Sequence, residues 1–235
     1  MIDIHCHILP DIDDGAADLV EAVKMAEIAL ADGIAGIIAT PHIKEPLIDR
    51  QSLSACHEIL KKCLEKKLIP VDIFLGGEVS IFIDSSMIKL YTINGTKYIL
   101  IEFPAGHLPK NAGETLFNLI VRGFLPIIAH PERNASILKK PDILFDLLNM
   151  KVLVQITAGS ITGMFGPDTK ACARFLLQKG VVSFIASDAH SAGYRRPVLS
   201  KGVQAAGKII GRENALKLVT ANPKAMLAGE PVKRR

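Results

Sequence analysis

Residues 33–42, GIAGIIATPH, recur in altered form twice further along the chain, and this repetition decides the expected fold. The second copy is GFLPIIAHPE at 123–132 and the third is GVVSFIASDAH at 180–190, and the three align without gaps. Each copy begins with a glycine suited to ending a helix, continues through a short apolar run and finishes in polar residues. Such an apolar run is typical of a strand buried on both faces of a parallel sheet. The repeat is therefore a strand–helix unit whose polar residues follow the strand.

Similar strands alternate with amphipathic helices through the rest of the chain. Residues 79–97 give no clear assignment apart from a turn at Asn94-Gly95. The expected helices lie at 17–31, 52–67, 112–122, 141–149, 168–179, 197–210 and 212–219. The expected strands lie near 2–7, 34–40, 71–76, 98–102, 125–129, 152–156 and 182–186.

This alternation predicts an α/β fold with a parallel sheet. We expect a distorted seven-stranded (β/α) TIM-like barrel, formed by one domain spanning residues 1–235. In a barrel the loops after the strands converge on one active-site mouth at the C-terminal ends of the strands. The alternative is an open doubly wound sheet, which would spread the strand ends along a line.

The composition is that of a globular protein, with 49% hydrophobic and 22% charged residues among 235. No apolar run approaches the roughly 18 residues of a membrane span, and no signal peptide is visible. Four cysteines without a CxxC motif suit a reducing compartment. We therefore expect a cytoplasmic protein without membrane insertion.

The net charge of +4 comes from scattered lysines and arginines. Lys61, Lys62, Lys66 and Lys67 cluster on one helix, but the glutamates among them favour a solvated helix face over a nucleic-acid patch. No nucleic-acid partner is expected. The basic end Lys233-Arg234-Arg235 is expected to be disordered.

The opening stretch MIDIHCHILPDIDDG contains the first candidate site residues. Because successive side chains of a strand point to opposite faces, His5 and His7 share a face and Cys6 points away. Asp11, Asp13 and Asp14 follow on the loop, of which only Asp14 enters the expected site. Two imidazoles followed by carboxylates make a plausible half of a metal site.

The other strand ends carry residues of the same kind. Five of the seven histidines and four carboxylates fall at or just after strand ends: His5, His7, Asp14, His42, Glu78, Glu102, His130, Asp188 and His190. Nine ligands suit two or three ions, and imidazole with carboxylate but no thiolate favours Mn, Fe or Zn. A carboxylate such as Glu78 can bridge two ions, since each oxygen can bind one.

Arginines on the mouth loops provide candidates for binding phosphate, because a planar guanidinium donates two parallel hydrogen bonds. We expect Arg133 to bind phosphate, together with Arg195 or Arg196. His107, on the loop after Glu102, is either a general acid on the substrate side of the site or a histidine of a surface loop. Cys172 lies in no Cys-x5-Arg loop, so cysteine-nucleophile phosphatase chemistry is not expected.

These residues resemble the nine-ligand pattern of the PHP (polymerase and histidinol phosphatase) superfamily, which has a distorted seven-stranded barrel and up to three metals. MIDIHCHILPDIDDG, YILIEFP, IIAHPER, SDAHS with Arg196-Pro197, and ANPKAML resemble one branch more closely. That branch is the bacterial manganese-dependent protein-tyrosine phosphatases of capsular and exopolysaccharide loci. The resemblance spans nearly the whole chain.

The resemblance implies three ion positions and a partner. It places the first ion on His5, His7, Glu78 and Asp188, the second on Glu78, Glu102 and His130, and the third on Asp14, His42 and His190. It implies Mn²⁺ as the cofactor and an autophosphorylating bacterial tyrosine kinase as the phosphotyrosine protein acted on. Segments 103–110 and 157–168 vary within the branch, so substrate preference does not carry over.

The expected function is hydrolysis of phosphotyrosine, in which a metal-bound hydroxide attacks phosphorus in line. The residues expected to act in catalysis are Arg133, Glu102, Arg196 and His42. One alternative is a small-metabolite phosphatase of the histidinol-phosphate type, which would share the metal site. The other is a non-catalytic metal-binding module, against which the intact ligand set argues.

Overall fold

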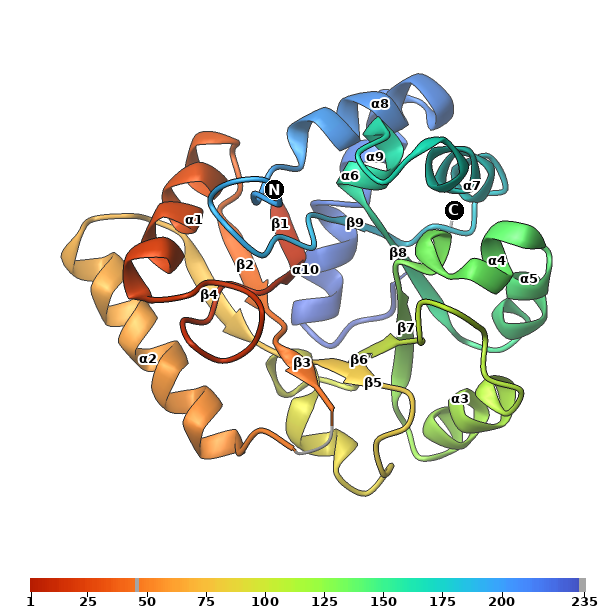
Figure 1. The fold of residues 1–235 in the computed structure, drawn as a ribbon, viewed down its shortest axis with the longest axis horizontal. Helices are drawn as coiled ribbons and strands as arrows, with labels where there is room; N and C mark the ends of the chain where they lie inside the picture. Colours follow the sequence, from red (N-terminus) through yellow and green to blue (C-terminus); the bar gives the residue numbers. More distant parts are fainter. Residues whose placement is uncertain (45–46, 233–235) are drawn as a thin grey trace.

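The structure is a computed structural model that describes residues 1–44 and 47–232 as alternating strands and helices (Figure 1). Residues 233–235, predicted to be a disordered end, lie outside this description. The strands are β1 (Ile2–Cys6), β2 (Gly36–Ala39), β3 (His42–Ile43), β4 (Asp72–Leu75), β5 (Glu78–Ser80), β6 (Tyr98–Glu102), β7 (Leu125–Ala129), β8 (Leu153–Thr157) and β9 (Phe184–Ala186).

The helices expected from the sequence are all present, with ends shifted by a few residues. The first begins where the carboxylate of Asp18 accepts a hydrogen bond from the Glu21 N–H at 2.8 Å, as an N-cap residue does. These helices are α1 (Leu19–Ala31), α2 (Arg50–Lys66), α3 (Ala112–Val121), α5 (Ile143–Leu148), α7 (Pro167–Gln178), α8 (Ser200–Ile210) and α9 (Arg212–Lys217). Short helices that were not predicted are α4 (Ala135–Lys139), α6 (Ala158–Thr162), α10 (Ala221–Leu227), η1 (Ile88–Tyr91), η2 (Ile93–Gly95) and η3 (Pro131–Arg133).

The strands form two parallel sheets, ordered β1-β2-β4 and β3-β5-β6-β7-β8-β9. Two of the seven predicted strands, 34–40 and 71–76, end close to where they were predicted to end, but a further short strand follows each. The breaks lie at Thr40-Pro41 between β2 and β3 and at Gly76-Gly77 between β4 and β5. Pro41 has no N–H to continue a ladder. A Cβ on Gly77 would lie 2.7 Å from Cγ1 of Ile43, so only glycine fits there. Each break carries the chain from the three-stranded sheet into the six-stranded one.

The predicted α/β fold with parallel strands is confirmed, but the predicted barrel is not seen as a closed sheet. Among the described residues, β4 keeps one free edge and no ladder runs from β9 back to β1. An isolated parallel bridge between Cys6 and Ala189 joins the two instead. The repeat predicted which residues become strands, but the proline and glycine breaks decide where the sheet splits.

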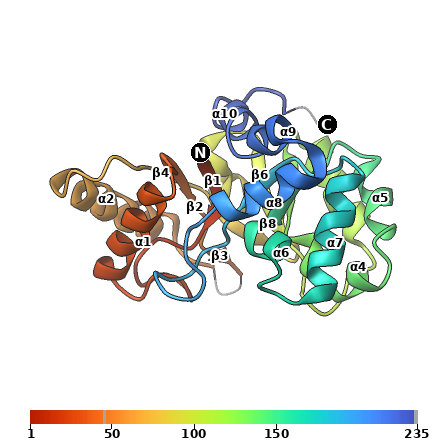
Figure 2. The same cartoon turned by 90° about the horizontal axis from the view of Figure 1, so that it is seen from above.

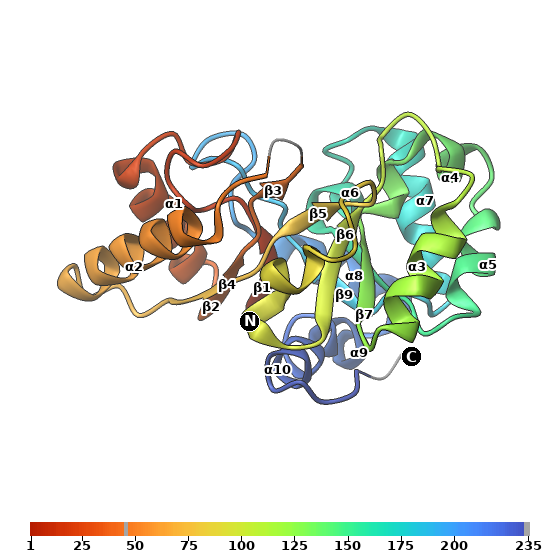
Figure 3. The same ribbon diagram turned by 90° about the horizontal axis from the view of Figure 1, so that it is seen from below.

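A buried inner core lies between the strands, and one of its ends is covered by the C-terminal helices. The hydroxyl of Tyr98 on β6 donates to the Glu230 carbonyl at 2.5 Å, and Met226 of α10 packs into the same cluster. Figure 2 shows α1 and α2 beside the three-stranded sheet, and Figure 3 shows α9 and α10 below the strands. The inner core includes Ile4, Ile38, Tyr98, Leu100, Ile127 and Phe184, all fully buried. The carboxyl ends of the strands are left open for a site.

Within residues 1–44 and 47–232, no helix has both the length and the apolar character needed to cross a membrane.

Candidate metal centre

The structure brings all nine predicted ligands together at the carboxyl ends of the strands. Their ligand atoms form four overlapping groups, and within each group these atoms lie within 4.8 Å of one another. The groups are His7, Asp14, His42 and His190; His5, Glu78 and His130; His5, His7 and Asp188; and His42, Glu78 and Glu102. The predicted grouping is therefore found in space, while metal binding by these residues stays a prediction.

The alternation of β1 turns His5 and His7 to the same side, while Cys6 is buried in the core. The Nε2 atoms of the two rings lie 3.2 Å apart. Nδ1 of His5 faces Oε1 of Gln155 at 3.0 Å, and Nδ1 of His7 faces Oδ2 of Asp13 at 2.6 Å. Because both oxygens accept, each Nδ1 donates, and in neutral rings the two Nε2 lone pairs face each other. A cation between them fits this arrangement.

Glu78 lies at the middle of the cluster and is almost fully buried. Its Oε1 lies 2.8 Å from Nε2 of His130, and its Oε2 lies 3.0 Å from Nδ1 of His42. Nε2 of His5 and of His7 lie 3.2 and 3.3 Å from the same Oε2. Despite these neighbours, Oε2 makes no hydrogen bond among the described residues. A buried, ionised oxygen without a donor is costly, so the donor set fits ions bridged by Glu78.

Asp14, His42 and His190 form the outer part of the centre. Oδ1 of Asp14 lies 3.5 Å from Nε2 of His42 and 3.5 Å from Nε2 of His190. The Asp14 side chain is 66% exposed, so this group opens to solvent. Glu102 joins from the other side, with its Oε2 3.5 Å from Nδ1 of His42.

Two of the nine residues have left-handed backbone conformations, His130 with φ 30° and Asp188 with φ 52°. Such conformations are uncommon for residues other than glycine and cluster at functional sites. The Asp188 N–H donates to the His5 carbonyl at 2.9 Å, which fixes the turn after β9 against β1. The strained backbone thus lies where two strand ends carry candidate ligands.

Two of the three candidate arginines contact the cluster, and both do so through Asp188. Nη1 of Arg133 and Nη2 of Arg195 bind the same Oδ2, the latter at 2.6 Å. The Arg133 guanidinium also lies over the ring of Phe165, 4.6 Å from its centroid. Arg196 instead donates from Nε to the Gly193 carbonyl, and in the described chain it forms no ion pair with the nine residues.

Burial and neighbouring charges shift the pKa values of the site in different directions. Burial lowers the pKa of His190, and His7 and Arg195 lower it further, to about 4, so its ring is neutral near pH 7. Burial also opposes a charged His42, but Glu102 and Glu78 outweigh it and raise its pKa to about 10. In the absence of a cation, a proton on His42 therefore balances these carboxylates, and a bound divalent ion would displace it.

Asp13 and Gln155 are functional candidates that the sequence reasoning missed, since Asp13 was given no role. Asp13 accepts from the ring of His7 and, at 2.9 Å, from the His42 N–H. Burial raises the pKa of Asp13, but its hydrogen bond with His7 outweighs this and lowers it to about 2. Outer partners of this kind fix the tautomer and orientation of ligand histidines. Gln155 could have been found as the lone amide in the buried strand LVQIT.

The remaining candidates lie away from the cluster. His107 is exposed, and its backbone carbonyl accepts a hydrogen bond from the Asn134 side-chain amide at 2.9 Å. Asp11 is exposed and its N–H donates to the Ala16 carbonyl. Burial, followed by the charge of Glu132, raises the pKa of the Cys172 thiol to about 12, which keeps it protonated. This agrees with the expectation that no cysteine nucleophile acts here.

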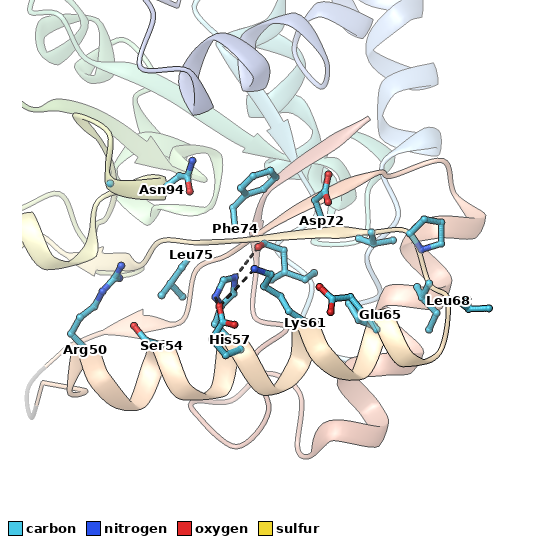
Figure 4. A pocket seen from close by; sticks show the side chains of 17 residues that line it. Arg50, Ser54, His57, Lys61, Glu65, Leu68, Asp72, Phe74, Leu75 and Asn94 are labelled. Atoms are coloured by element: carbon cyan, nitrogen blue, oxygen red, sulfur yellow. Dashed lines mark hydrogen bonds and ion pairs between the residues drawn. The ribbon is translucent and has the colours of Figure 1, made fainter.

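A larger hollow lies away from the candidate metal centre. A cavity of about 1020 Å³ lies between α2 and β4 and contains none of the nine residues (Figure 4). A smaller pocket of about 300 Å³ opens directly beside the cluster, where it is lined by Glu102, His130, Arg133, Phe103 and Phe165. The small pocket is the one next to the candidate chemistry.

Residues 1–228 match the protein family described as capsular polysaccharide synthesis, CpsB/CapC. The chain belongs to this family. It is 38% identical to the tyrosine-protein phosphatase YwqE of Bacillus subtilis, over 100% of this chain and 98% of that one. It is 30% identical to the tyrosine-protein phosphatase CpsB of Streptococcus agalactiae, over 97% and 98% of the two chains.

The fold is similar to that of a solved relative. One chain from the crystal structures of YwqE from Bacillus subtilis and CpsB from Streptococcus pneumoniae superposes with a TM-score of 0.94. The alignment covers 100% of this chain and 97% of that one at 37% identity. Those two proteins are described as metal-dependent tyrosine phosphatases. The predicted family and enzyme class are confirmed by these relatives.

Proposed function

We propose that this protein is a metal-dependent phosphatase that hydrolyses phosphotyrosine in proteins. The observation that carries the proposal is the gathering of nine imidazole and carboxylate side chains around Glu78, with Arg133 and Arg195 at its edge. Cations beside two guanidinium groups suit a dianionic phosphoryl group. The names of the relatives YwqE and CpsB support the same activity.

The donor set supports manganese, in two or three ions, with iron or zinc as alternatives, because nitrogen and oxygen ligands occur without thiolate. When bound, such ions lower the pKa of a water and stabilise negative charge on phosphoryl oxygens. The residues that would hold them are His5, His7, Glu78 and Asp188 for the first ion, Glu78, Glu102 and His130 for the second, and Asp14, His42 and His190 for the third.

The residues around the ligands hold protons and charge in place. Asp13 and Gln155 keep the protons of His7 and His5 on Nδ1, so that both Nε2 atoms are free to act as ligands. Arg133 uses one nitrogen on Asp188 and retains other donors of its planar group for phosphate. We assign the second phosphate contact to Arg195 rather than Arg196, because Arg195 contacts the cluster.

The small pocket beside Arg133 provides a place for the tyrosine ring. Phe103 and Phe165 supply aromatic walls, on which a phenyl ring can pack edge to face or offset. A phenol has a pKa near 10, so its anion leaves without a dedicated acid. We assign no general acid among the site residues, and hydrolysis of an aryl phosphate needs one less than hydrolysis of an alkyl phosphate does.

The proposed function also includes the domain that carries the site and the protein that is dephosphorylated. We propose that residues 1–235 act as one phosphatase domain, in which β2–β3 and β4–β5 each count as one strand of a seven-stranded barrel. The substrate is an autophosphorylating bacterial tyrosine kinase in the cytoplasm. A small-metabolite phosphatase of the histidinol-phosphate type is the second candidate, because it would use the same cluster.

The deciding experiment compares hydrolysis of p-nitrophenyl phosphate, a phosphotyrosine peptide and histidinol phosphate. Each is measured with the protein as purified, after chelation, and after Mn²⁺, Fe²⁺ or Zn²⁺ is restored. We expect chelation to abolish hydrolysis, Mn²⁺ to restore it, and the peptide to be preferred over histidinol phosphate. Hydrolysis that survives chelation would refute the metal mechanism, and preference for histidinol phosphate would favour the second candidate.

A further inference from the structure

A groove of about 670 Å³ lies beside the metal centre and is not accounted for by the chemistry above. Its walls come from the end of α1, the loop between α6 and α7, and residues 193–198, and it reaches the first turn of α8. These segments lie close together at the top of the molecule in Figure 1. The groove is therefore assembled from four separate parts of the chain.

The groove shares residues with the candidate phosphate site. Arg195 lines it, and the same side chain binds Oδ2 of Asp188 at 2.6 Å and the Asp188 carbonyl at 3.0 Å. Phe165 lines both this groove and the small pocket beside Glu102 and His130. A polypeptide whose phosphotyrosine reached the metal centre would therefore pass Phe165 and Arg195 into the groove.

Two glycines let the parts that line the groove pack closely against one another. A Cβ on Gly202 would lie 2.6 Å from Cβ of Ala158, and one on Gly159 would lie 3.0 Å from the Phe165 ring. Larger side chains at either position would push these parts of the chain apart and distort the groove. Tyr194 and Met164 are exposed at the rim, by 73% and 41%, and offer apolar surface to a bound chain.

The polar lining of the groove is cationic. Arg195, Arg196 and Lys201 face one carboxylate, that of Asp32. Asp32 is already engaged, since its Oδ2 accepts from the N–H groups of Leu199 at 2.7 Å and Ser200 at 2.8 Å. Neither Arg196 nor Lys201 forms an ion pair with a described residue. Because Arg195 is paired with Asp188, the groove has two further cations, Arg196 and Lys201, against the one carboxylate of Asp32, and its net charge is positive.

The position of Lys201 is itself unfavourable for the helix that carries it. Lys201 is the second residue of α8, where the helix dipole disfavours a positive charge. A cation there costs a little stability, whereas glutamate at the same position would be favourable. The helix therefore gives no reason for a lysine at this position, which lines the groove.

We propose that this groove binds the polypeptide that flanks the phosphotyrosine, and that it selects substrates with Asp or Glu close to the phosphorylated residue. Arg196 and Lys201 contact these acidic side chains, and Tyr194 packs against the peptide backbone. Opposite charges steer encounter and fix the position of the chain, which gives specificity. The inference rests on the proposed phosphotyrosine phosphatase activity.

The test uses two phosphotyrosine peptides that differ only in having Glu or Lys at the positions flanking the phosphotyrosine. It measures kcat/KM for both peptides and for p-nitrophenyl phosphate, which has no flanking chain. The wild-type protein should prefer the Glu peptide by about three- to tenfold at low salt, with a smaller ratio at high salt. Lys201→Glu should abolish or reverse the preference and leave p-nitrophenyl phosphate hydrolysis unchanged. Lys208→Glu, which alters an exposed lysine on the same helix outside the groove, should keep the wild-type preference.

Equal kcat/KM for the two peptides in the wild-type protein would overturn the inference while leaving the phosphatase activity intact. Retention of the wild-type preference by Lys201→Glu would also overturn the inference. An equal loss of preference in Lys208→Glu would overturn it as well, because the net charge of the protein, and not the groove, would then cause the preference. If neither peptide nor p-nitrophenyl phosphate is hydrolysed in the presence of Mn²⁺, the proposed function fails and the inference fails with it.

Discussion

The cavity between α2 and β4 is larger than the pocket at the candidate metal centre, yet none of the nine candidate ligands lines it. In the cavity, Nε2 of His57 donates to the Ile73 carbonyl at 2.7 Å, and Lys61 pairs with Glu58 at 3.7 Å (Figure 4). At the metal centre, three imidazole nitrogens surround an oxygen of Glu78 that accepts no hydrogen bond in the described chain. In the described chain Nη1 of Arg50 in the cavity is also buried without a hydrogen-bond partner, but no cluster of candidate ligands surrounds it. A buried unpaired atom therefore indicates a site where other candidate ligands converge on it, and volume alone does not.

Glu78→Gln should have the largest effect, because it removes the negative charge shared by the inner ligands. We expect kcat for p-nitrophenyl phosphate to fall at least about a thousandfold, toward the upper end of losses seen for removed electrostatic stabilisation. The amide keeps the side-chain shape, so circular dichroism should be unchanged. His57→Gln in the larger cavity serves as the control, and equal losses in both variants would erase the distinction between the two regions.

Arg133→Ala should lower kcat/KM by about a hundredfold, because a charged donor to the phosphoryl group is lost. Arg133→Lys should recover only part of this loss, since an ammonium lacks the planar fork. Arg50→Ala is the matched control, because Arg50 is the arginine that lines the larger cavity. Steady-state kinetics that showed the same decrease for Arg50→Ala would argue against a specific phosphate contact at Arg133.

Asp13→Asn should weaken metal binding by about tenfold or more, as loss of an outer hydrogen bond to a ligand histidine does. The measurement is titration of the chelated protein with Mn²⁺, followed by calorimetry and by recovered activity. Excess metal should restore much of kcat, because the ligands themselves are intact. A variant with unchanged affinity would show that the bond between Asp13 and His7 has no role in holding the ring.

Asp13 also gives a pH dependence with a defined sign. Its pKa in the folded protein is lowered to about 2, below the ordinary value of about 3.9, so its ionised form stabilises the fold. This contribution is fully present above about pH 4 and is lost as the pH falls toward 2. Chemical denaturation of the chelated protein should show a smaller loss over this range for Asp13→Asn than for the wild type.

His57→Gln should have the smallest effect. Removing a hydrogen bond to a strand carbonyl should lower the free energy of unfolding by about 1 kcal/mol, with catalysis unchanged. Urea unfolding and p-nitrophenyl phosphate kinetics on the same sample separate the two quantities. A large decrease in kcat with only about 1 kcal/mol lost in the free energy of unfolding would instead indicate that the larger cavity has a role in catalysis.

The sequence predicted the grouping of the nine candidate ligands more fully than it predicted the fold. His5 and His7 follow from strand alternation, and the other seven positions follow from the rule that parallel strands deliver polar residues at their carboxyl ends. Asp13 was missed because three carboxylates stand close together on one loop and spacing alone does not choose among them.

The breaks in the sheet and the short helices could not be read from periodicity. Thr40-Pro41 and Gly76-Gly77 looked like strand ends, but the chain resumes as β3 and β5 after each. Helices such as α4 and α6 have five residues, fewer than two turns, so no apolar period can be recognised in them. Their positions depend on packing between distant parts of the chain.

The bridge between Cys6 and Ala189 has a consequence for the order of folding. His5 lies near the start of the chain and Asp188 near its end, so the first ion position can be complete only after β9 has docked on β1. Contacts this distant in sequence form late, because a long loop must close before they stabilise the structure. Ions bound there would stabilise this junction, at which the described residues form no continuous ladder. Chelation should therefore speed unfolding at this junction before it affects β6 to β8.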